Sequence, residues 1–319
     1  MTERAASPRG ETGAAQLGSR PVTQPVSTPA GELHPAVAEK KLPPLPAPLL
    51  APVVDAHTHL DACGCRDADD VAAAMERAAA VGVQQVVTVA DDLASARWAV
   101  QAAHWHPDVY AAVALHPTRA DVLDDDARAE LERLAADPRV VAIGETGLDF
   151  YWDYAQPDVQ REVFAWHIDL AKRVGKPLMI HDRDAHDAIL EVLDAEGAPP
   201  TVVFHCFSGD AAFARRCVDA GYFLSFAGPV TFRNAPDLHA AVRIVPADRL
   251  LVETDAPFLT PHPHRGRRNE PFALPWTVRA VAALREVEER EIANATRIAT
   301  HSAYPLMGDV TPLPEELSD

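Results

Sequence analysis

The sequence has few cysteines and no long hydrophobic segment. Its four cysteines are Cys63, Cys65, Cys206 and Cys217, and no two of them have the CxxC spacing of a zinc knuckle or a redox motif. We therefore expect reduced thiols, with metal binding by Cys63 as the alternative. No apolar run approaches the roughly 20 residues that a membrane helix needs, and the N-terminus lacks a compact apolar segment of the signal-peptide type. These absences predict a cytoplasmic protein without a membrane partner.

Positive charge is also scarce. The 29 Lys and Arg residues face 47 Asp and Glu residues, which gives a formal net charge of −18. Residues 1–50 hold five of the basic and four of the acidic side chains, so the rest of the chain carries −19. A domain this acidic has no general electrostatic attraction for nucleic acid. A nucleic-acid substrate would need bound cations and a local basic segment, for which residues 262–269, HPHRGRRN, are the candidate.

Residues 1–50 differ in composition from the rest of the chain. They are rich in Pro, Ala, Ser, Thr and Gly and lead into KLPPLPAPLLAP. A segment of this kind buries too little apolar surface to offset its ordering entropy. We predict a disordered tail with a stiff, polyproline-like end. A folded domain over residues 51–310 and a short flexible C-terminus over residues 311–319 are expected to follow it.

From residue 53 onward, short β-branched runs alternate with amphipathic stretches. The runs cover residues 53–59, 84–90, 109–115, 140–145, 177–181, 201–206, 222–227 and 250–254. Runs of Val, Ile and Leu indicate strands that are covered on both faces. The stretch DADDVAAAMERAAAVG begins with acidic capping residues and ends at glycine, as a helix does. Eight such units predict an α/β fold, a TIM-type (β/α)8 barrel, with an open doubly wound sheet as the alternative.

Side chains of metal-ligand type stand at the C-terminal ends of these runs. They are His57, His59, Glu145, His181, His205 and Asp255. His57 and His59 are two residues apart on one strand, so their side chains point the same way. In a closed barrel, strand ends that are distant in sequence converge on one face. The set therefore predicts a hydrolytic metal centre, and its imidazole and carboxylate groups suit Zn, Mn, Co or Mg without choosing among them.

Glu145 and Asp255 are the candidate catalytic residues. A carboxylate in the position of Glu145 can bridge two cations a few ångströms apart, an arrangement that activates water in phosphoryl transfer. Asp255 can bind one cation and accept a proton from water as a general base. The structural alternatives are a helix cap or a buried ion pair for Glu145, and a capping role before Ala256 for Asp255.

Several longer segments follow one another in order between residue 53 and about residue 300. They are DAHTHLD, ALHP, GETGLDFYW, HDRDA, HCFSG, GPVTFRNA, ETDAPFLTP and RGRRNEP. In these segments the chain resembles the TatD family of metal-dependent deoxyribonucleases, within the amidohydrolase-like barrels. The resemblance implies a TIM-type barrel that hydrolyses DNA phosphodiester bonds, often as a 3′-to-5′ exonuclease, with one or two divalent cations.

The resemblance also implies roles by position. His57 and His59 would bind one metal ion, which Asp255 completes. His181 and His205 would serve the second ion, and Glu145 would bridge the two. The chain departs from the family at His167, where the family often has Gln, and we expect this side chain to point outward or to pack.

Three further side chains are candidate substrate ligands. Arg183 follows His181 by two residues, and its guanidinium can bind a phosphate oxygen in a forked geometry. His116 follows the third run and also reaches the rim. Arg267 lies after the eighth run, in the usual phosphate-binding region of such barrels. The alternatives are an ion pair for Arg183 and a solvated charge cluster for Arg267. The aromatic residues 150–152 can stack on bases or roof the core.

Two other functions compete with the nuclease hypothesis. An amidohydrolase that cleaves a small amide, ester or lactone uses a similar ligand set, but commonly bridges its metal ions with a carboxylated lysine where this chain has Glu145. A non-catalytic metal-binding scaffold has no need of the complete set of ligands. We therefore expect a metal-dependent hydrolase with DNA as its substrate and no stable protein partner.

Overall fold

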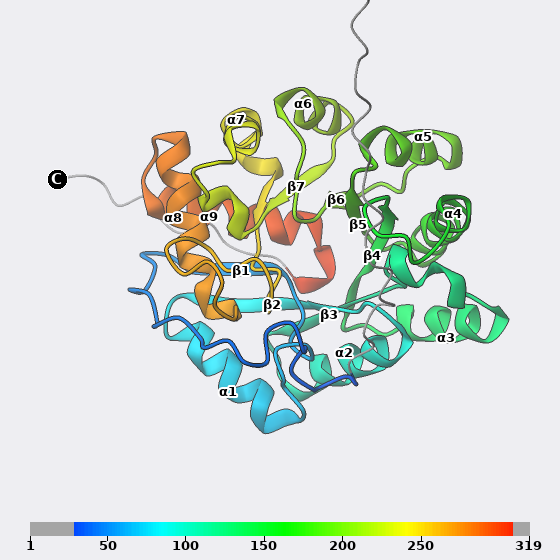
Figure 1. The fold of residues 1–319 in the computed structure, drawn as a ribbon, viewed down its shortest axis with the longest axis horizontal. Coiled ribbons are helices and arrows are strands. Elements are labelled where there is room, and N and C mark those ends of the chain that lie inside the picture. The colour runs from blue at the N-terminus through cyan, green and yellow to red at the C-terminus, as the bar shows by residue number, and fades with distance from the viewer. Residues whose placement is uncertain (1–28, 309–319) are drawn as a thin grey trace, which may run out of the picture.

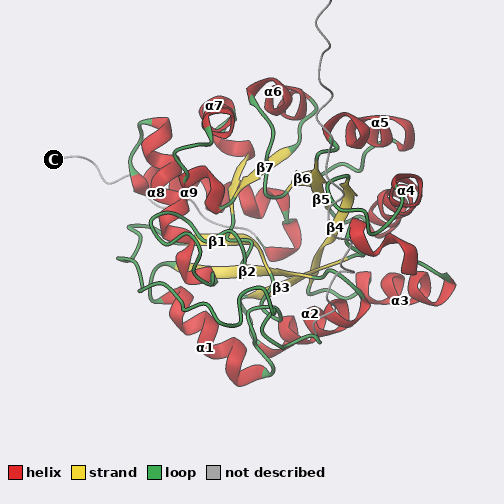
Figure 2. Ribbon diagram, viewed as in Figure 1, coloured by secondary structure: helices red, strands yellow, loops and turns green. Residues whose placement is uncertain are grey.

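The computed structural model describes residues 29–308, which form a barrel of parallel strands surrounded by helices (Figures 1 and 2). The strands are β1 (Val53–Thr58), β2 (Val83–Val89), β3 (Val109–Val113), β4 (Val140–Asp149), β5 (Leu178–Arg183), β6 (Val202–Phe204), β7 (Phe223–Phe226) and β8 (Leu250–Val252). The helices are α1 (Ala68–Ala79), α2 (Leu93–Trp105), α3 (Asp125–Ala135), α4 (Pro157–Val174), α5 (His186–Glu196), α6 (Ala211–Asp219), α7 (Pro236–Ile244), α8 (Leu274–Arg285) and α9 (Glu289–Ala303). The alternation confirms the predicted (β/α)8 barrel.

The sheet runs in sequence order from β1 to β8, and every neighbouring pair is parallel. Backbone hydrogen bonds just beyond the last strand connect it to the first. The N–H of Asp255 donates to the carbonyl oxygen of His57 at 3.0 Å, and the N–H of His59 donates to that of Ala256 at 2.7 Å. These bonds bring the end of β8 beside the end of β1, so the HxH pair and Asp255 meet although they are far apart in sequence.

Alternate strand residues build two separate cores. Val53 and Val83 pack outward against the helices, whereas Val54 and Val87 point into the barrel. Tyr304, just after α9, is fully buried in the inner core. The barrel interior is thus filled by side chains, and only its rim is free to bind a ligand.

Two helix ends show how local sequence sets the helix boundaries. Asp67 precedes α1, and its side chain accepts hydrogen bonds from the backbone N–H groups of Asp69 and Asp70. Gly175 ends α4 with a φ of 66°, a left-handed conformation that glycine adopts without steric cost. Local sequence signals therefore fix the start of α1 and the end of α4, whereas α5, α7, α8 and α9 begin without a side-chain cap.

Residues 29–50 differ from the prediction of a disordered tail, because they run along the barrel surface and contact it. The N–H of Leu49 donates to the carbonyl oxygen of Val81 at 3.0 Å. Arg279 donates to the carbonyl oxygens of Ala47 and Pro48 at 2.9 and 3.1 Å. The composition of the segment shows only that it cannot fold by itself, whereas several of its backbone groups bond here to groups of the barrel.

The predictions for residues 1–28 and for the C-terminal residues 311–319 lie outside the described residues. Among the helices of residues 29–308, none has the length and apolar character that spanning a membrane requires.

Candidate metal centre

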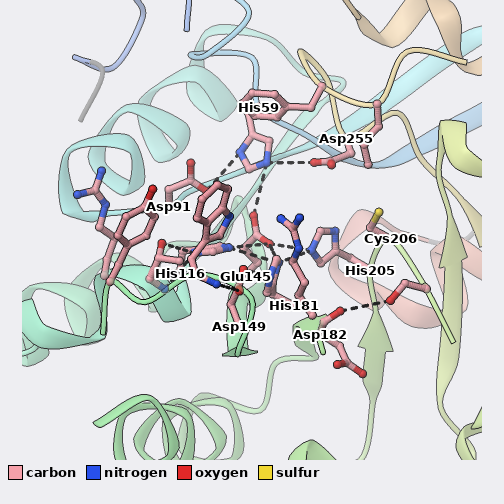
Figure 3. Close-up of a pocket in the computed structure, with 18 of the residues that line it drawn as sticks. His59, Asp91, His116, Glu145, Asp149, His181, Asp182, His205, Cys206 and Asp255 are labelled. Carbon is pink, nitrogen blue, oxygen red and sulfur yellow. Dashed lines mark hydrogen bonds and ion pairs between the residues drawn. The ribbon is translucent and has the colours of Figure 1, made fainter. Parts of the chain in front are cut away.

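A cavity of about 700 Å³ opens at the C-terminal ends of the strands (Figure 3). Five of the six predicted metal ligands line it: His59, Glu145, His181, His205 and Asp255. The sixth, His57, is completely buried beside them. The structure thus brings the whole predicted set together, from β1, β4, β5, β6 and the segment after β8.

The first group of donors surrounds the two imidazoles of the HxH motif. His57 Nε2 lies 3.1 Å from His59 Nε2, and both atoms lie 3.5 Å from Glu145 Oε1. Asp255 Oδ1 lies 3.7 Å from His57 Nε2 and 3.4 Å from His59 Nε2. Ligand atoms about 2.1 Å from a tetrahedral cation lie about 3.4 Å from one another. The separations of His57, His59 and Asp255 therefore fit a shared divalent cation, with one oxygen of Glu145 beside both imidazoles.

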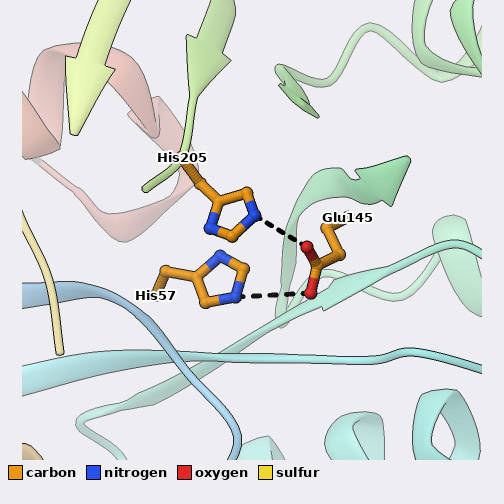
Figure 4. A group of neighbouring side chains, drawn as sticks. All are labelled: His57, Glu145 and His205. Carbon is orange, nitrogen blue, oxygen red and sulfur yellow. Dashed lines mark ion pairs between the residues drawn. The ribbon is translucent and has the colours of Figure 1, made fainter. Parts of the chain in front are cut away.

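The second group of donors meets the other oxygen of Glu145. His205 Nε2 lies 2.7 Å from Glu145 Oε2, and His181 Nδ1 lies 3.1 Å from it. Figure 4 shows the carboxylate of Glu145 facing His57 with one oxygen and His205 with the other. The rings of His57 and His205 stack with their centroids 4.0 Å apart. Glu145 thus stands between two groups of imidazoles, which is the position of a bridging ligand.

Carboxylates that the sequence analysis did not select lie beside the second nitrogen of two of these rings. Asp149 Oδ2 lies 3.1 Å from His181 Nε2, and Glu253 Oε1 lies 3.4 Å from His205 Nδ1. Such partners fix the orientation of a metal-binding imidazole. Both acids occur at or just after strand ends, in GLD and ETD, so a signal was present. It was missed because strand position does not distinguish an acid that binds a metal from one that orients a ring.

Asp91, two residues after β2, was also missed. Its Oδ1 lies 3.7 Å from His59 Nδ1, and it could hold a cation together with His59 and Glu145. The acid follows a strand in the sequence TVADD, which is the same strand-end signal. Asp91 therefore extends the donor set on the side of β1 and β2.

Burial and the neighbouring charges set the protonation of the centre. Burial, with help from His205, lowers the pKa of His57 to about 4, so this ring is neutral near pH 7 and has a lone pair for a cation. Burial acts to raise the pKa of Glu145, but the charge of His205 and hydrogen bonds from His181 and His205 outweigh it and hold that pKa well below its usual value. The bridging position is thus occupied by an ionised carboxylate.

The predicted substrate ligands have different positions. Arg183 lines the cavity, and its guanidinium carbon lies 3.8 Å from the ring centroid of Tyr151. His116 also lines the cavity, but its Nε2 lies 3.3 Å from His181 Nδ1. His116 could hold a cation together with Asp149 and His181, so it belongs with the metal-type donors rather than with an outer rim.

Arg267 does not have the position at the cavity that the sequence predicted. It is not among the described residues that line the cavity, and its Nη1 donates to the carbonyl oxygen of Leu42 at 3.1 Å. The prediction placed Arg267 by its position after β8. The direction of its side chain is set instead by the N-terminal segment, whose contact with this loop the sequence analysis did not foresee.

His167 is fully buried on α4. Its Nε2 accepts the N–H of Leu115 at 3.2 Å, and its Nδ1 donates to the carbonyl oxygen of Val163 at 2.8 Å. It therefore packs in the interior and does not point outward. Both of its ring nitrogens are satisfied outside the metal-type donors.

A barrel that carries imidazole and carboxylate donors on the C-terminal rim has the architecture of a metal-dependent hydrolase. The family model described as TatD related DNase matches residues 54–305, and the chain belongs to this family. It is 64% identical to an uncharacterized metal-dependent hydrolase TatD of Mycobacterium tuberculosis, over 80% of this chain and 98% of that protein. A 3′-5′ ssDNA/RNA exonuclease TatD of Cronobacter turicensis is 37% identical, over 72% and 91%.

Solved structures agree with this assignment. The crystal structure of YJJV, a TatD homolog from Escherichia coli K12, superimposes with a TM-score of 0.74 at 29% identity, over 79% of this chain and 98% of that one. A TatD family hydrolase from Entamoeba histolytica has a TM-score of 0.70 at 19% identity, over 81% and 98%, and supports the fold. The chain is thus a metal-dependent hydrolase of the TatD family.

Proposed function

We propose that the chain is a metal-dependent phosphodiesterase that shortens single-stranded DNA from its 3′ end. One observation carries the proposal. Glu145 presents Oε1 to His57 and His59 and Oε2 to His181 and His205. A carboxylate in this position can hold two cations, the arrangement that serves in-line displacement at phosphorus.

We assign the cation ligands and the general base as follows. His57, His59 and Asp255 would hold one cation and His181 and His205 a second, with Glu145 between them. Bound cations supply Lewis-acid stabilisation of phosphoryl oxygens and lower the pKa of water. Asp255 lines the cavity beside His59 and is placed to accept the proton of the attacking water.

The cavity also offers a surface for nucleotides. Arg183, Trp152 and Tyr154 line it, and Tyr151 lies under the Arg183 guanidinium; we call these four residues the aromatic wall. The rings of Trp152 and Tyr154 stack at 5.4 Å with an interplanar angle of 11°. Aromatic faces at a rim bind bases without reading their sequence, and a guanidinium binds phosphate oxygens.

The names of relatives support a nucleic-acid substrate. Two Cronobacter relatives, 37% and 35% identical, are named 3′-5′ ssDNA/RNA exonuclease. The amidohydrolase alternative is less well supported, since the residues that line the described cavity include no lysine to be carboxylated, and Glu145 occupies the bridging position.

A substrate panel tests the proposal. Chelator-treated protein is supplied with Mg²⁺, Mn²⁺, Zn²⁺ or Co²⁺ in turn and given single-stranded DNA, double-stranded DNA, a p-nitrophenyl ester and a small amide. We expect the fastest hydrolysis with single-stranded DNA, with 5′-labelled products that shorten stepwise. Ester or amide hydrolysis without DNA cleavage would instead establish a small-molecule amidohydrolase. Cation binding without any turnover would establish a scaffold.

A further inference from the structure

The family match begins at residue 54, yet a residue well before it lines the cavity. That residue is His34. We propose that residues 29–42, here called the strap, complete the substrate cleft of this chain. In this arrangement His34 donates a hydrogen bond to a phosphate oxygen of the bound DNA strand. The inference rests on the proposed phosphodiesterase function and names a substrate contact beyond the metal-type donors.

The position of His34 is fixed by an aromatic contact next to the HxH motif. Its ring meets the ring of Phe258 edge to face, with centroids 5.0 Å apart and an interplanar angle of 78°. The ring of Phe258 in turn lies 6.3 Å from that of His59. His34, Phe258 and His59 all line the cavity. The strap therefore borders the His59 side of the cleft.

The hydrogen-bonding state of His34 suits a neutral donor. Its Nδ1 accepts the backbone N–H of Ala36 at 3.2 Å, so in the neutral ring the proton is on Nε2. Partial burial and the nearby His59 lower the pKa of His34 below its usual value. An imidazole N–H at this place can bond an anionic oxygen without adding a charge next to the cations.

The strap is held by a backbone hydrogen bond, a close approach at a glycine and a buried side chain. The N–H of His34 donates to the carbonyl oxygen of Ala62 at 3.0 Å. Gly31 has a φ of 87°, and a Cβ there would lie 3.0 Å from Arg66 Cα, so glycine is needed for this approach. Val37 is buried, with 3% of its surface exposed. The strap thus has a defined path over the loop after β1.

Arg267 has a role in this arrangement. Its guanidinium donates to the carbonyl oxygen of Leu42 at 3.1 Å, and the neighbouring Arg268 N–H donates to that of Lys41 at 3.1 Å. The basic loop after β8 therefore anchors the C-terminal end of the strap. Arg267 acts on the substrate cleft through the strap, as a positioning residue.

The two sides of the cleft are built from different elements. Figure 3 shows His59 and Asp255 on one side of Glu145, and Asp149 and Asp182 on another. Three residues of the aromatic wall follow Asp149 in the sequence, and the fourth, Arg183, follows Asp182. The strap instead reaches the cavity beside His59. We expect a DNA strand of several nucleotides to contact both, and a small phosphodiester bound at the metal-type donors to contact His34 little or not at all. The contribution of His34 should therefore depend on substrate length.

The test compares full-length variants on substrates of graded length. His34→Ala should raise KM for a single-stranded octanucleotide at least about tenfold, as expected for one hydrogen bond to a charged oxygen. It should change kcat less than about twofold, and should leave hydrolysis of bis(p-nitrophenyl) phosphate unchanged. His34→Gln keeps a donor and should recover most of the loss. Arg267→Ala should raise the octanucleotide KM by less than His34→Ala does.

His106 offers a matched control. Its Nδ1 accepts the N–H of Asp108 at 3.1 Å, the same local contact that His34 makes with Ala36, but it lies between α2 and β3 and does not line the cavity. His106→Ala should leave KM unchanged. Equal KM values for wild type and His34→Ala on the octanucleotide overturn the proposal, and so does an equal loss on the small phosphodiester. Failure of wild type to cleave DNA with any cation would instead refute the proposed function.

Discussion

The floor and the rim of the cavity are held in place by different means. The floor consists of the donors at the strand ends, His57, His59, Glu145, His181, His205 and Asp255, and is covered by protein on nearly every side. The rim consists of the aromatic wall and the strap, and Trp152 there is 36% exposed. Sheet hydrogen bonds fix the floor, whereas side-chain stacking and contacts between loops fix the rim. We therefore expect residues of the floor to determine the rate of hydrolysis and residues of the rim to determine which substrate binds.

The largest effect should come from the floor. Glu145→Gln keeps the size of the side chain but removes the charge that faces both imidazole groups. We expect kcat for single-stranded DNA to fall at least about a hundredfold, the size seen when a major electrostatic element of an active site is lost. Steady-state kinetics and metal content measured on the same folded preparation check this. A folded variant with nearly wild-type turnover would show that the floor is not the reaction centre.

A smaller effect should follow when a residue that orients one of the floor imidazoles is changed. Glu253 is fully buried and accepts the N–H of Cys206 at 2.6 Å beside His205. Glu253→Gln should weaken cation affinity about tenfold, because it loosens the orientation of a ligand imidazole. Turnover at saturating cation should change little. Glu130→Gln, which alters a surface ion pair with Arg97, is the control. Unchanged affinity in Glu253→Gln would mean that His205 needs no orienting partner.

The rim should act on KM. Trp152→Ala should raise KM for single-stranded DNA about tenfold, since base–aromatic stacking contributes about 1–3 kcal/mol per base. Trp152→Phe keeps an aromatic face and should lose much less. If Trp152→Ala lowers kcat and leaves KM unchanged, the rim does not act on substrate binding, and the proposed difference between floor and rim is wrong. Steady-state rates over a range of oligonucleotide concentrations distinguish these outcomes.

A change outside the cavity should affect stability and leave catalysis as it is. Burial lowers the pKa of His167 to about 4, so between pH 6.5 and 4 the unfolded chain binds a proton that the folded chain does not. Stability contributed by the neutral ring is complete above the unfolded pKa and is lost as pH falls, by about 2 kcal/mol at pH 5. His167→Gln should flatten this loss without affecting kcat. Urea unfolding at pH 7 and pH 5 measures it, and equal losses in both proteins would contradict this origin.

Much of the floor could be predicted from the sequence, for a physical reason. The side chains of a strand alternate with a period of two, and parallel strands in a barrel end on one face. The ends of five short apolar runs were therefore sufficient to predict that His57, Glu145 and Asp255 would meet. Asp149 and Glu253, which lie beside the second ring nitrogens of His181 and His205, were not predicted. Strand position alone does not distinguish an acid that binds a metal from one that orients a ring.

The rim could not be predicted in the same way. Arg267 was expected at the substrate, but its guanidinium donates to a backbone carbonyl of the strap. The strap was expected to be disordered, because its composition prevents it from forming a core of its own. Its path depends on contacts with loops that are far away in sequence, such as that of His34 with Ala62. Local composition and periodicity contain no information on such contacts.

Anomalous diffraction from crystals soaked in Mn²⁺ tests the central claim most directly. The account predicts manganese density bonded to the Glu145 carboxylate, in contact with His57 and His59 on one side or with His181 and His205 on the other. Density on both sides would establish Glu145 as a bridging ligand. Manganese bound elsewhere in the protein, with none at Glu145, would contradict the account.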